Sequence, residues 1–314
     1  MKFAFITDPL SSFNIKKDST YAMMVEAARR GHELHVLMQE GLIWKGGRVI
    51  GENMRITLTG EKEHWYRALP PVETALEDFD AVLMRKDPPF DMEYVTSTWL
   101  LEIAKADGAR IFNDPRAIRD HSEKLAIAQF SRFTAPTLVS RLAGQIHEFI
   151  AAHGDVILKP LDGMGGASIF RVTDSDPNRN VIVETLTHLG ARTIMAQRYI
   201  PEIRDGDKRV LLIGGKPVPH CLARVPRPGE TRGNLAAGGT GIARPLSARD
   251  REIAEILGPD LARRGLLLVG LDVIGNYLTE VNVTSPTCFQ EITQQTGFSV
   301  PGMFIDALEA ACAR

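Results

Sequence analysis

The sequence predicts an α/β N-terminal domain built on a parallel sheet, followed by a larger α+β region. In the first part of the chain, short apolar strands alternate with helical segments, which is typical of a parallel sheet. The second part changes to short strands separated by glycine-rich turns. The chain has 314 residues, about twice the length of an ordinary domain, which favours two or more domains around a shared cleft.

The parallel sheet is predicted from a strand-helix-strand opening. Residues 3–7 form an apolar strand, and Asp18 or Ser19 can cap a helix that continues to Gly31. Residues 34–38 form the next strand. The alternation continues with a strand at 81–84, a helix at 95–106 and a strand at 110–112. The turn after the first strand lacks the Gly-x-Gly-x-x-Gly pattern and so gives little support for a dinucleotide-binding site.

A helix is predicted from residue 122 to residue 133, and Pro136 follows it. The chain then changes to short strands, at 156–159, 168–172, 194–199 and 208–213. Most of the polar motifs lie in this α+β half, so we interpret it as the catalytic half. The sequence contains no internal repeat and no low-complexity segment.

Composition and charge are those of an ordinary soluble enzyme. The chain is 44% hydrophobic and 24% charged, with a formal net charge of −2, so it offers no basic field for nucleic acid. Its N-terminal apolar run is too short for a signal peptide, and no stretch reaches membrane-spanning length, so we expect a cytoplasmic protein without a membrane partner. The cysteines Cys221, Cys288 and Cys312 are odd in number and widely spaced, and we interpret them as buried or incidental thiols.

Residues 272–287 form a predicted hairpin with three oxygen ligands, Asp272, Glu280 and Asn282. Such a sparse set of carboxylate and amide oxygens suits Mg²⁺, which fills its other positions with water and nucleotide oxygens. Asp272 shares a face with Glu280 and Asn282 only if it lies opposite Glu280, which predicts a three-residue loop or a β-bulge. The alternative is an acidic hairpin edge that is kept polar for solubility.

A glycine-rich loop follows the predicted strand that ends at Lys159. Bare glycines let backbone N–H groups approach phosphate oxygens, and lysine adds a positive charge. The loop is not a Walker motif, because the lysine precedes the glycines and a strand follows them. Lys124 is a second basic position upstream. The alternative is a hairpin with a flexible turn.

Several segments resemble the ATP-grasp superfamily and, within it, the bacterial glutathione synthetase family. The resemblance covers nearly the whole chain and is carried by residues 14–19, 84–90, 157–171, 205–210, 230–239 and 280–287. It implies an ATP-grasp domain of two subdomains after the N-terminal domain. The implied division is an N-terminal substrate domain at 1–122, a lid subdomain at 123–200 and a C-terminal catalytic subdomain at 201–314, with a mobile loop at 226–241.

The resemblance implies an ATP site. Lysines hold the phosphates, the glycine-rich loop covers them, and residues 196–200 meet the adenine edge. Many relatives carry an acidic residue where Arg198 stands, and Asp207 is our candidate for the ribose hydroxyls. Strand residues Gln197 and Tyr199 also fit an ordinary strand with alternating faces. The full set of implied ATP-binding residues is Lys124, Lys159, Asp162, Gly163, Met164, Gly165, Gly166, Ser168, Gln197, Arg198, Tyr199, Ile200 and Asp207.

A ligase that joins a carboxylate to an amine needs arginines aimed at fixed points. We expect Arg209, Arg232 and Asn234 to be catalytic. Loop 226–241 contains too few large apolar groups to pack a core, and we interpret it as a lid that excludes water; the alternative is a tolerated surface insertion. The expected substrate-binding residues are Asn14, Asp18, Arg85, Lys86, Arg224, Ser285 and Thr287; Arg85 and Lys86 also fit a solvated basic pair, and Ser285 and Thr287 plain turn chemistry.

By resemblance, the reaction joins γ-glutamylcysteine to glycine through an acyl phosphate, with ATP as co-substrate and Mg²⁺, or Mn²⁺, as cofactor. The products are glutathione, ADP and phosphate, and the family suggests a homotetramer. No general base for the glycine amine is evident in the sequence. The alternatives are a sister ligase that joins D-amino acids or adds glutamates to a protein, and a non-catalytic ATP-binding module.

Overall fold

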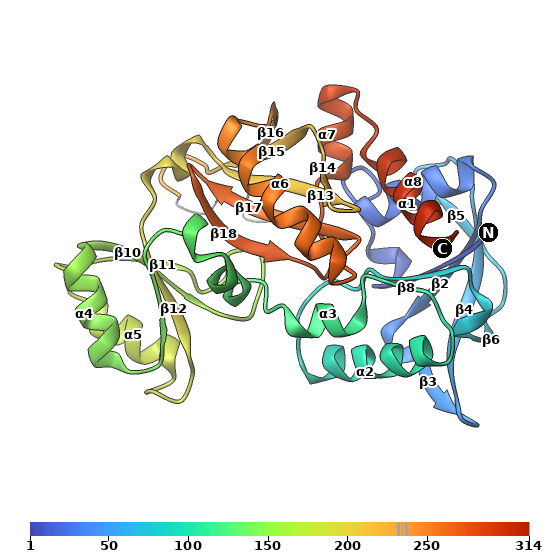
Figure 1. Cartoon of the computed structure of the whole chain (residues 1–314), viewed down its shortest axis with the longest axis horizontal. Coiled ribbons are helices and arrows are strands. Elements are labelled where there is room, and N and C mark those ends of the chain that lie inside the picture. The colour runs from blue at the N-terminus through green and yellow to red at the C-terminus, as the bar shows by residue number, and fades with distance from the viewer. Residues whose placement is uncertain (231–232, 234, 236–237, 314) are drawn as a thin grey trace.

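The computed structural model describes residues 1–230, 233, 235 and 238–313. It contains an eight-stranded, a four-stranded and a six-stranded β-sheet with helices packed on them (Figure 1). The first sheet uses the N-terminal part of the chain. The four-stranded sheet with α4 and α5 lies at one end of the molecule in Figure 1, and the six-stranded sheet lies between it and the first.

The first sheet has the strand order β3-β4-β2-β1-β7-β8, and β5 and β6 also pair with β4. Its predicted part is confirmed, because β2, β1, β7 and β8 run parallel. The antiparallel strands β3 to β6 were not predicted. The strands are β1 (Lys2–Thr7), β2 (Glu33–Met38), β3 (Leu42–Lys45), β4 (Arg48–Leu58), β5 (Tyr66–Ala68), β6 (Val72–Ala75), β7 (Ala81–Met84) and β8 (Ile111–Phe112).

Helices cover both faces of this sheet, as the alternation of β1 requires. Phe3 and Phe5 pack in one core with three helices, α1 (Ser19–Arg29), α7 (Phe289–Thr296) and α8 (Val300–Cys312). Ala4 and Ile6 pack in another core with α2 (Met92–Ala106) and α3 (Pro115–Asp120). Asp18 caps α1 as predicted, because its carboxylate accepts a 2.6 Å hydrogen bond from the Tyr21 N–H.

The four-stranded sheet is antiparallel, in the order β11-β10-β12-β9. Two helices bury one of its faces through a core that includes Ile146, Ile150 and Val183. The elements are β9 (Thr137–Ser140), α4 (Ala143–His153), β10 (Asp155–Pro160), β11 (Phe170–Thr173), α5 (Arg179–Thr187) and β12 (Ile194–Arg198).

The six-stranded sheet has the order β16-β15-β13-β17-β18, with β14 paired to β13. Both faces of β13 are buried: Val210 and Leu212 face a core with α6, whereas Leu211 and Ile213 join the core of the C-terminal helices. The elements are β13 (Asp207–Ile213), β14 (Lys216–Pro217), β15 (His220–Val225), β16 (Thr240–Pro245), α6 (Ala248–Arg263), β17 (Leu268–Ile274) and β18 (Tyr277–Asn282).

Three predicted boundaries need correction. The helix expected at 122–133 is a 3₁₀ helix over Leu125–Phe133 that is interrupted at Phe130, and its buried side chains pack on the six-stranded sheet. The strand expected at 168–172 is Phe170–Thr173, because Ser168 has a φ of 57°, which a strand does not allow. The loop expected at 226–241 ends in β16. The other 3₁₀ helices are Leu10–Ser12, Gln39–Gly41, Leu76–Asp78 and Pro201–Asp205.

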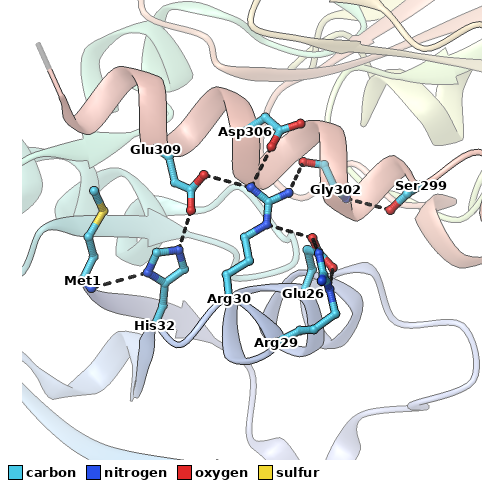
Figure 2. A network of polar contacts seen from close by, with 9 residues as sticks. All are labelled: Met1, Glu26, Arg29, Arg30, His32, Ser299, Gly302, Asp306 and Glu309. Carbon is cyan, nitrogen blue, oxygen red and sulfur yellow. Dashed lines mark hydrogen bonds and ion pairs between the residues drawn. The ribbon is translucent and has the colours of Figure 1, made fainter.

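Hydrogen bonds and ion pairs connect the C-terminal part of the chain to the N-terminal domain. The Asn113 side chain, after β8, donates to the Leu268 and Val283 carbonyls at 2.8 and 2.9 Å. At the α1–α8 junction, Arg30 contacts four groups (Figure 2): the carboxylates of Glu26, Asp306 and Glu309 and the carbonyl of Gly302. Hydrogen bonds from Arg29 and Arg30 lower the pKa of Glu26 to about 2.

Replacing Arg30 with methionine is expected to lower the free energy of unfolding by roughly 1–3 kcal/mol, because a partly buried cation with several acidic partners is lost. Arg29→Met is the matched control: Arg29 also contacts Glu26 but is 68% exposed, so its replacement should change the free energy of unfolding much less. Urea unfolding followed by circular dichroism measures both. Equal losses would contradict a special role for Arg30.

Among the residues that the structure describes, no helix is long and apolar enough to cross a membrane.

Candidate active site

Two adjoining pockets lie where the four-stranded and six-stranded sheets meet. The first pocket has a volume of about 860 Å³ and is lined by β10, β12, the glycine-rich loop, β13 and the β17–β18 hairpin. The second pocket, of about 790 Å³, is lined by the same loop and hairpin and by residues 284–288. Gly163, Met164, Gly165 and Glu280 line both pockets, so a ligand in one can react with a ligand in the other.

The first pocket collects most of the residues expected to bind ATP. Apolar side chains from two different sheets, Ile157 on β10 and Ile274 on β17, are part of its lining. The expected residues that line it are Lys124, Lys159, Gly163, Met164, Gly165, Gly166, Gln197, Arg198, Tyr199, Ile200 and Asp207.

Both lysines line the first pocket. Lys124 Nζ donates to the Gly163 carbonyl at 2.9 Å and lies 3.7 Å from a Glu280 oxygen. Lys159 is only 5% exposed, and burial lowers the pKa of its ammonium group. Anionic phosphates bound here would supply a negative partner for the buried ammonium group of Lys159.

The β17–β18 hairpin has the predicted irregularity. Asp272 lies opposite Glu280, whereas Val273 pairs with Leu278, so Thr279 is the extra residue of a β-bulge. Gly275 and Asn276 form a two-residue turn beyond it. The prediction that a loop or a bulge brings Asp272 and Glu280 to one face is therefore confirmed. Of the two, the structure contains the bulge.

Asp272 lies at the centre of a buried network of charges. One of its carboxylate oxygens accepts from Arg209 Nε at 2.6 Å, and the other lies 2.8 Å from Arg224 Nη2. Arg224 also contacts Asp207, at 2.6 Å. Burial opposes ionisation, but the two guanidinium groups lower the pKa of Asp272. Burial raises the pKa of Asp207 to about 6, in spite of Arg224.

A glycine makes room for this network on β17. A Cβ atom at Gly270 would lie 2.9 Å from Cδ of Arg209 and 3.1 Å from Cβ of Pro286, closer than side-chain carbons pack. Any larger residue would therefore displace Arg209 from Asp272.

The second pocket collects part of the expected substrate and metal residues. Arg209, Arg224, Asp272, Glu280, Asn282, Ser285 and Thr287 line it. The substrate residues expected in the N-terminal domain do not line it, although Asp87 and Pro88 do. Asp18 caps α1, Asn14 accepts from the Lys16 N–H, and Lys86 pairs with Asp8 at 2.7 Å. Buried Arg85 donates to the Pro286 carbonyl at 3.0 Å, so it contacts the wall of the pocket from behind.

Two residues expected at the ATP site lie outside the first pocket. The Asp162 carboxylate is paired with Arg192, and both line a third pocket, together with Pro88, Phe90 and Glu123. Ser168 is held in a left-handed conformation at the end of the loop. Their assignment to ATP stays a prediction.

The residues expected to meet adenine lie on and just after β12. The Gln197 side chain is buried and donates to Thr137 at 3.0 Å, whereas Arg198 donates to the Tyr277 hydroxyl at 3.1 Å. The ring of Tyr199 stacks under the Arg171 guanidinium. These side chains are held by neighbouring protein groups, so a ligand would meet mainly their backbone.

Arg232 and Asn234 lie outside the described residues, as do parts of the expected lid 226–241. Gly233 lines the first pocket and Leu235 lines the second. The described parts of this segment thus border both pockets, and the lid stays a prediction.

Several residues of the second pocket were not predicted from the sequence, and Glu123 and Cys288 are among them. Glu123 immediately precedes Lys124, which was a signal that an adjacent charged residue could share the site. Cys288 is buried with a φ of 86°, and burial raises the pKa of its thiol. The expectation that all three cysteines are free and buried is confirmed.

Two antiparallel sheets that meet around paired lysines, a glycine-rich loop and an acidic hairpin define the ATP-grasp class of ligases. The models of the prokaryotic glutathione synthetase N-terminal domain and of its ATP-grasp domain match residues 1–119 and 123–297. The chain therefore belongs to the prokaryotic glutathione synthetase family.

Curated relatives and solved structures agree with this class. The chain is 67% identical to the glutathione synthetase of Ralstonia nicotianae, with 100% of this chain and 97% of the relative covered. It is 63% identical to that of Nitrosomonas europaea, with 100% and 99% covered. The D-cycloserine synthetase DcsG has the same fold, with a TM-score of 0.67 and 16% identity over 99% of this chain and 100% of that one.

Proposed function

We propose that this chain joins γ-glutamylcysteine to glycine with the energy of ATP and releases glutathione, ADP and phosphate. The observation that carries the proposal is its 67% identity, over the full length, to a relative named glutathione synthetase. The adjoining pockets support it, because a phosphoryl-transfer site and a site for carboxylates share one wall.

The geometry fits a two-step reaction. Lys124 and Lys159 hold the phosphates of ATP at the junction, and a carboxylate oxygen of the dipeptide in the second pocket attacks the γ-phosphorus, so that ADP leaves. The ammonium group of glycine loses a proton to solvent, and its amine attacks the acyl carbon. A C–N bond forms, the C–O bond to the phosphoryl group breaks so that phosphate leaves, and the nitrogen gives up a second proton. The protein's part is positioning and charge stabilisation, with Arg209 and Arg224 orienting substrate carboxylates. We also propose that Arg232 and Asn234 contribute from the lid.

We propose that Asp272, Glu280 and Asn282 would hold a magnesium ion. The Asn282 amide nitrogen donates to the Gly270 carbonyl at 3.1 Å, which leaves its oxygen free to act as a ligand. The described residues contain no group of three His, Cys, Asp or Glu side chains that could hold a metal ion, so we propose that nucleotide phosphates complete the site. When bound, Mg²⁺ or Mn²⁺ would neutralise charge on the transferred phosphoryl group.

A panel of amino acids tests the substrate assignment. With Mg-ATP and γ-glutamylcysteine, we expect glycine to stimulate ADP release and to give a product with the mass of glutathione. Turnover with D-alanine or L-glutamate in place of glycine would indicate a sister ligase. ATP binding without turnover would indicate a non-catalytic module.

We further propose a cytoplasmic homotetramer, on the basis of the family resemblance. The division into residues 1–122, 123–200 and 201–314 is also a proposal. It is supported by the sheets, whose strands span residues 2–112, 137–198 and 207–282. Sedimentation velocity of the purified chain measures the assembly, and a monomer at micromolar concentration would contradict it.

A further inference from the structure

The second pocket contains a carboxylate that the proposed reaction has not used. Glu123 precedes Lys124 and lines the second pocket. Its Oε1 accepts three hydrogen bonds: from the Val283 N–H at 3.0 Å, the Thr284 N–H at 3.1 Å and the Thr284 hydroxyl at 2.8 Å. The three hydrogen bonds to Oε1 hold the segment after β18 in place. They also set the orientation of the Glu123 carboxylate.

The other oxygen, Oε2, has no hydrogen-bond partner among the described residues, and no described cation lies within 4.0 Å of Glu123. Two other carboxylates of the pocket are different, because Asp272 is paired with two arginines and Glu280 has Lys124 nearby. Asp87 also has no described cation within 4.0 Å, but it stabilises the charge of Arg85 electrostatically. Burial raises the pKa of Glu123, in spite of the hydrogen bonds from Thr284 and Val283, so a cation beside Oε2 would favour its charged form.

A cationic ligand would provide that compensation. An amino acid enters as a zwitterion, and its carboxylate can pair with a guanidinium, but its ammonium group needs an acceptor. We propose that Glu123 Oε2 binds the ammonium group of the amino acid that is added, glycine, and so aims its nitrogen at the acyl carbon. The inference rests on the proposed function and assigns the amine subsite.

The position of Glu123 indicates that its ligand is the ammonium group of glycine and not the ammonium group of γ-glutamylcysteine. Glu123 adjoins Lys124, and its carbonyl accepts from the Val281 N–H at 2.9 Å, next to Glu280. The reacting nitrogen must come to this place, because the phosphorylated carboxyl group lies beside the phosphates. The ammonium group of γ-glutamylcysteine is at the opposite end of the dipeptide from its reacting carboxylate. It therefore lies away from Glu123.

The Glu123→Gln variant removes the carboxylate charge while keeping the hydrogen bonds that hold the segment after β18. Glutamine keeps an oxygen that can accept the same three hydrogen bonds, but it presents a neutral NH₂ group to the pocket. Loss of a charged hydrogen bond should raise KM for glycine about 10- to 100-fold. KM for γ-glutamylcysteine and for ATP should change less than about twofold. Glu255→Gln is the control: it makes the same change at a carboxylate that is 58% exposed on α6, so KM for glycine should stay near the wild-type value.

Glycolate, with a hydroxyl in place of the ammonium group, gives a second readout. The wild-type protein should bind glycine far better than glycolate, measured by inhibition of synthesis, and Glu123→Gln should reduce that preference. An unchanged KM for glycine in Glu123→Gln would overturn the inference, as would a rise in KM for γ-glutamylcysteine instead or a shift in the half-saturating Mg²⁺ concentration. A loss of stability in Glu123→Gln that leaves the protein partly unfolded under the assay conditions would show a structural role only and would also overturn the inference. A wild-type protein that makes no glycine adduct would instead overturn the proposed function and with it the subsite.

Discussion

Replacing Asp272 with asparagine is expected to lower the free energy of unfolding by about 3–5 kcal/mol, because it leaves buried positive charge without a partner. Asp272 and Arg209 are 2% and 7% exposed. Arg224 would keep Asp207, but Arg209 would lose the carboxylate that it contacts through two nitrogens. Denaturant unfolding, followed by fluorescence and by circular dichroism, measures the loss.

A double variant provides the control for this prediction. Arg209→Met with Asp272→Met removes both charges, and burial of apolar groups at the same place should restore much of the stability. Synthesis of glutathione should remain defective, because both proposed functional groups are absent. If Asp272→Asn alone stays within about 1 kcal/mol of wild type, the network is not a major source of stability.

Replacing Glu280 with glutamine is expected to lower the rate of synthesis by roughly 10²–10³ while the fold stays intact, by analogy with the loss of one stabilising group in other active sites. The Glu280 side chain is 22% exposed, and its contact with a cation, Lys124, is long, at 3.7 Å. The amide would be a poorer magnesium ligand, so the half-saturating Mg²⁺ concentration should rise.

Initial rates at increasing Mg²⁺ concentration measure this effect, and Glu255→Gln is the matched control. Glu255 is 58% exposed on α6, and its contact with Arg251 is 4.0 Å long, so its replacement should change neither rate nor stability. Wild-type rates in Glu280→Gln would contradict the metal assignment. A large loss of stability in that variant would mean that the rate reports unfolding.

Local patterns in the sequence were sufficient for several parts of the fold. Apolar strands next to capped helices predicted the parallel core, and the Asp18 cap forms as expected. The facing of Asp272 and Glu280 followed from strand periodicity, since only an extra residue brings both to one face. Among the missed antiparallel strands, β3 and β6 pair only with β4 and leave residues such as Trp44 and Val72 exposed, which blurs their alternation. The internal strand β4 does alternate between buried and exposed residues, so its pattern was a signal that was overlooked.

The site was only partly predictable, because its contacts join distant segments. The pairing of Asp272 with Arg209 spans 63 residues and depends on the register of β13 against β17. Arg85 looked like a ligand residue at the end of a strand, but its guanidinium reaches the Pro286 carbonyl, 201 residues away. Glu123 was overlooked because only the folded chain shows that its second oxygen lacks a cation.

Oxygen transfer tests the central claim, that the two pockets couple phosphoryl transfer to amide formation. The measurement uses γ-glutamylcysteine labelled with oxygen-18 in its cysteinyl carboxylate, together with Mg-ATP and glycine, and analyses the products by mass spectrometry. We predict that one of the two labelled oxygens stays in the new amide carbonyl of glutathione and that the other is recovered in the released phosphate. Glutathione formation with unlabelled phosphate, or ADP release without glutathione, would contradict the account.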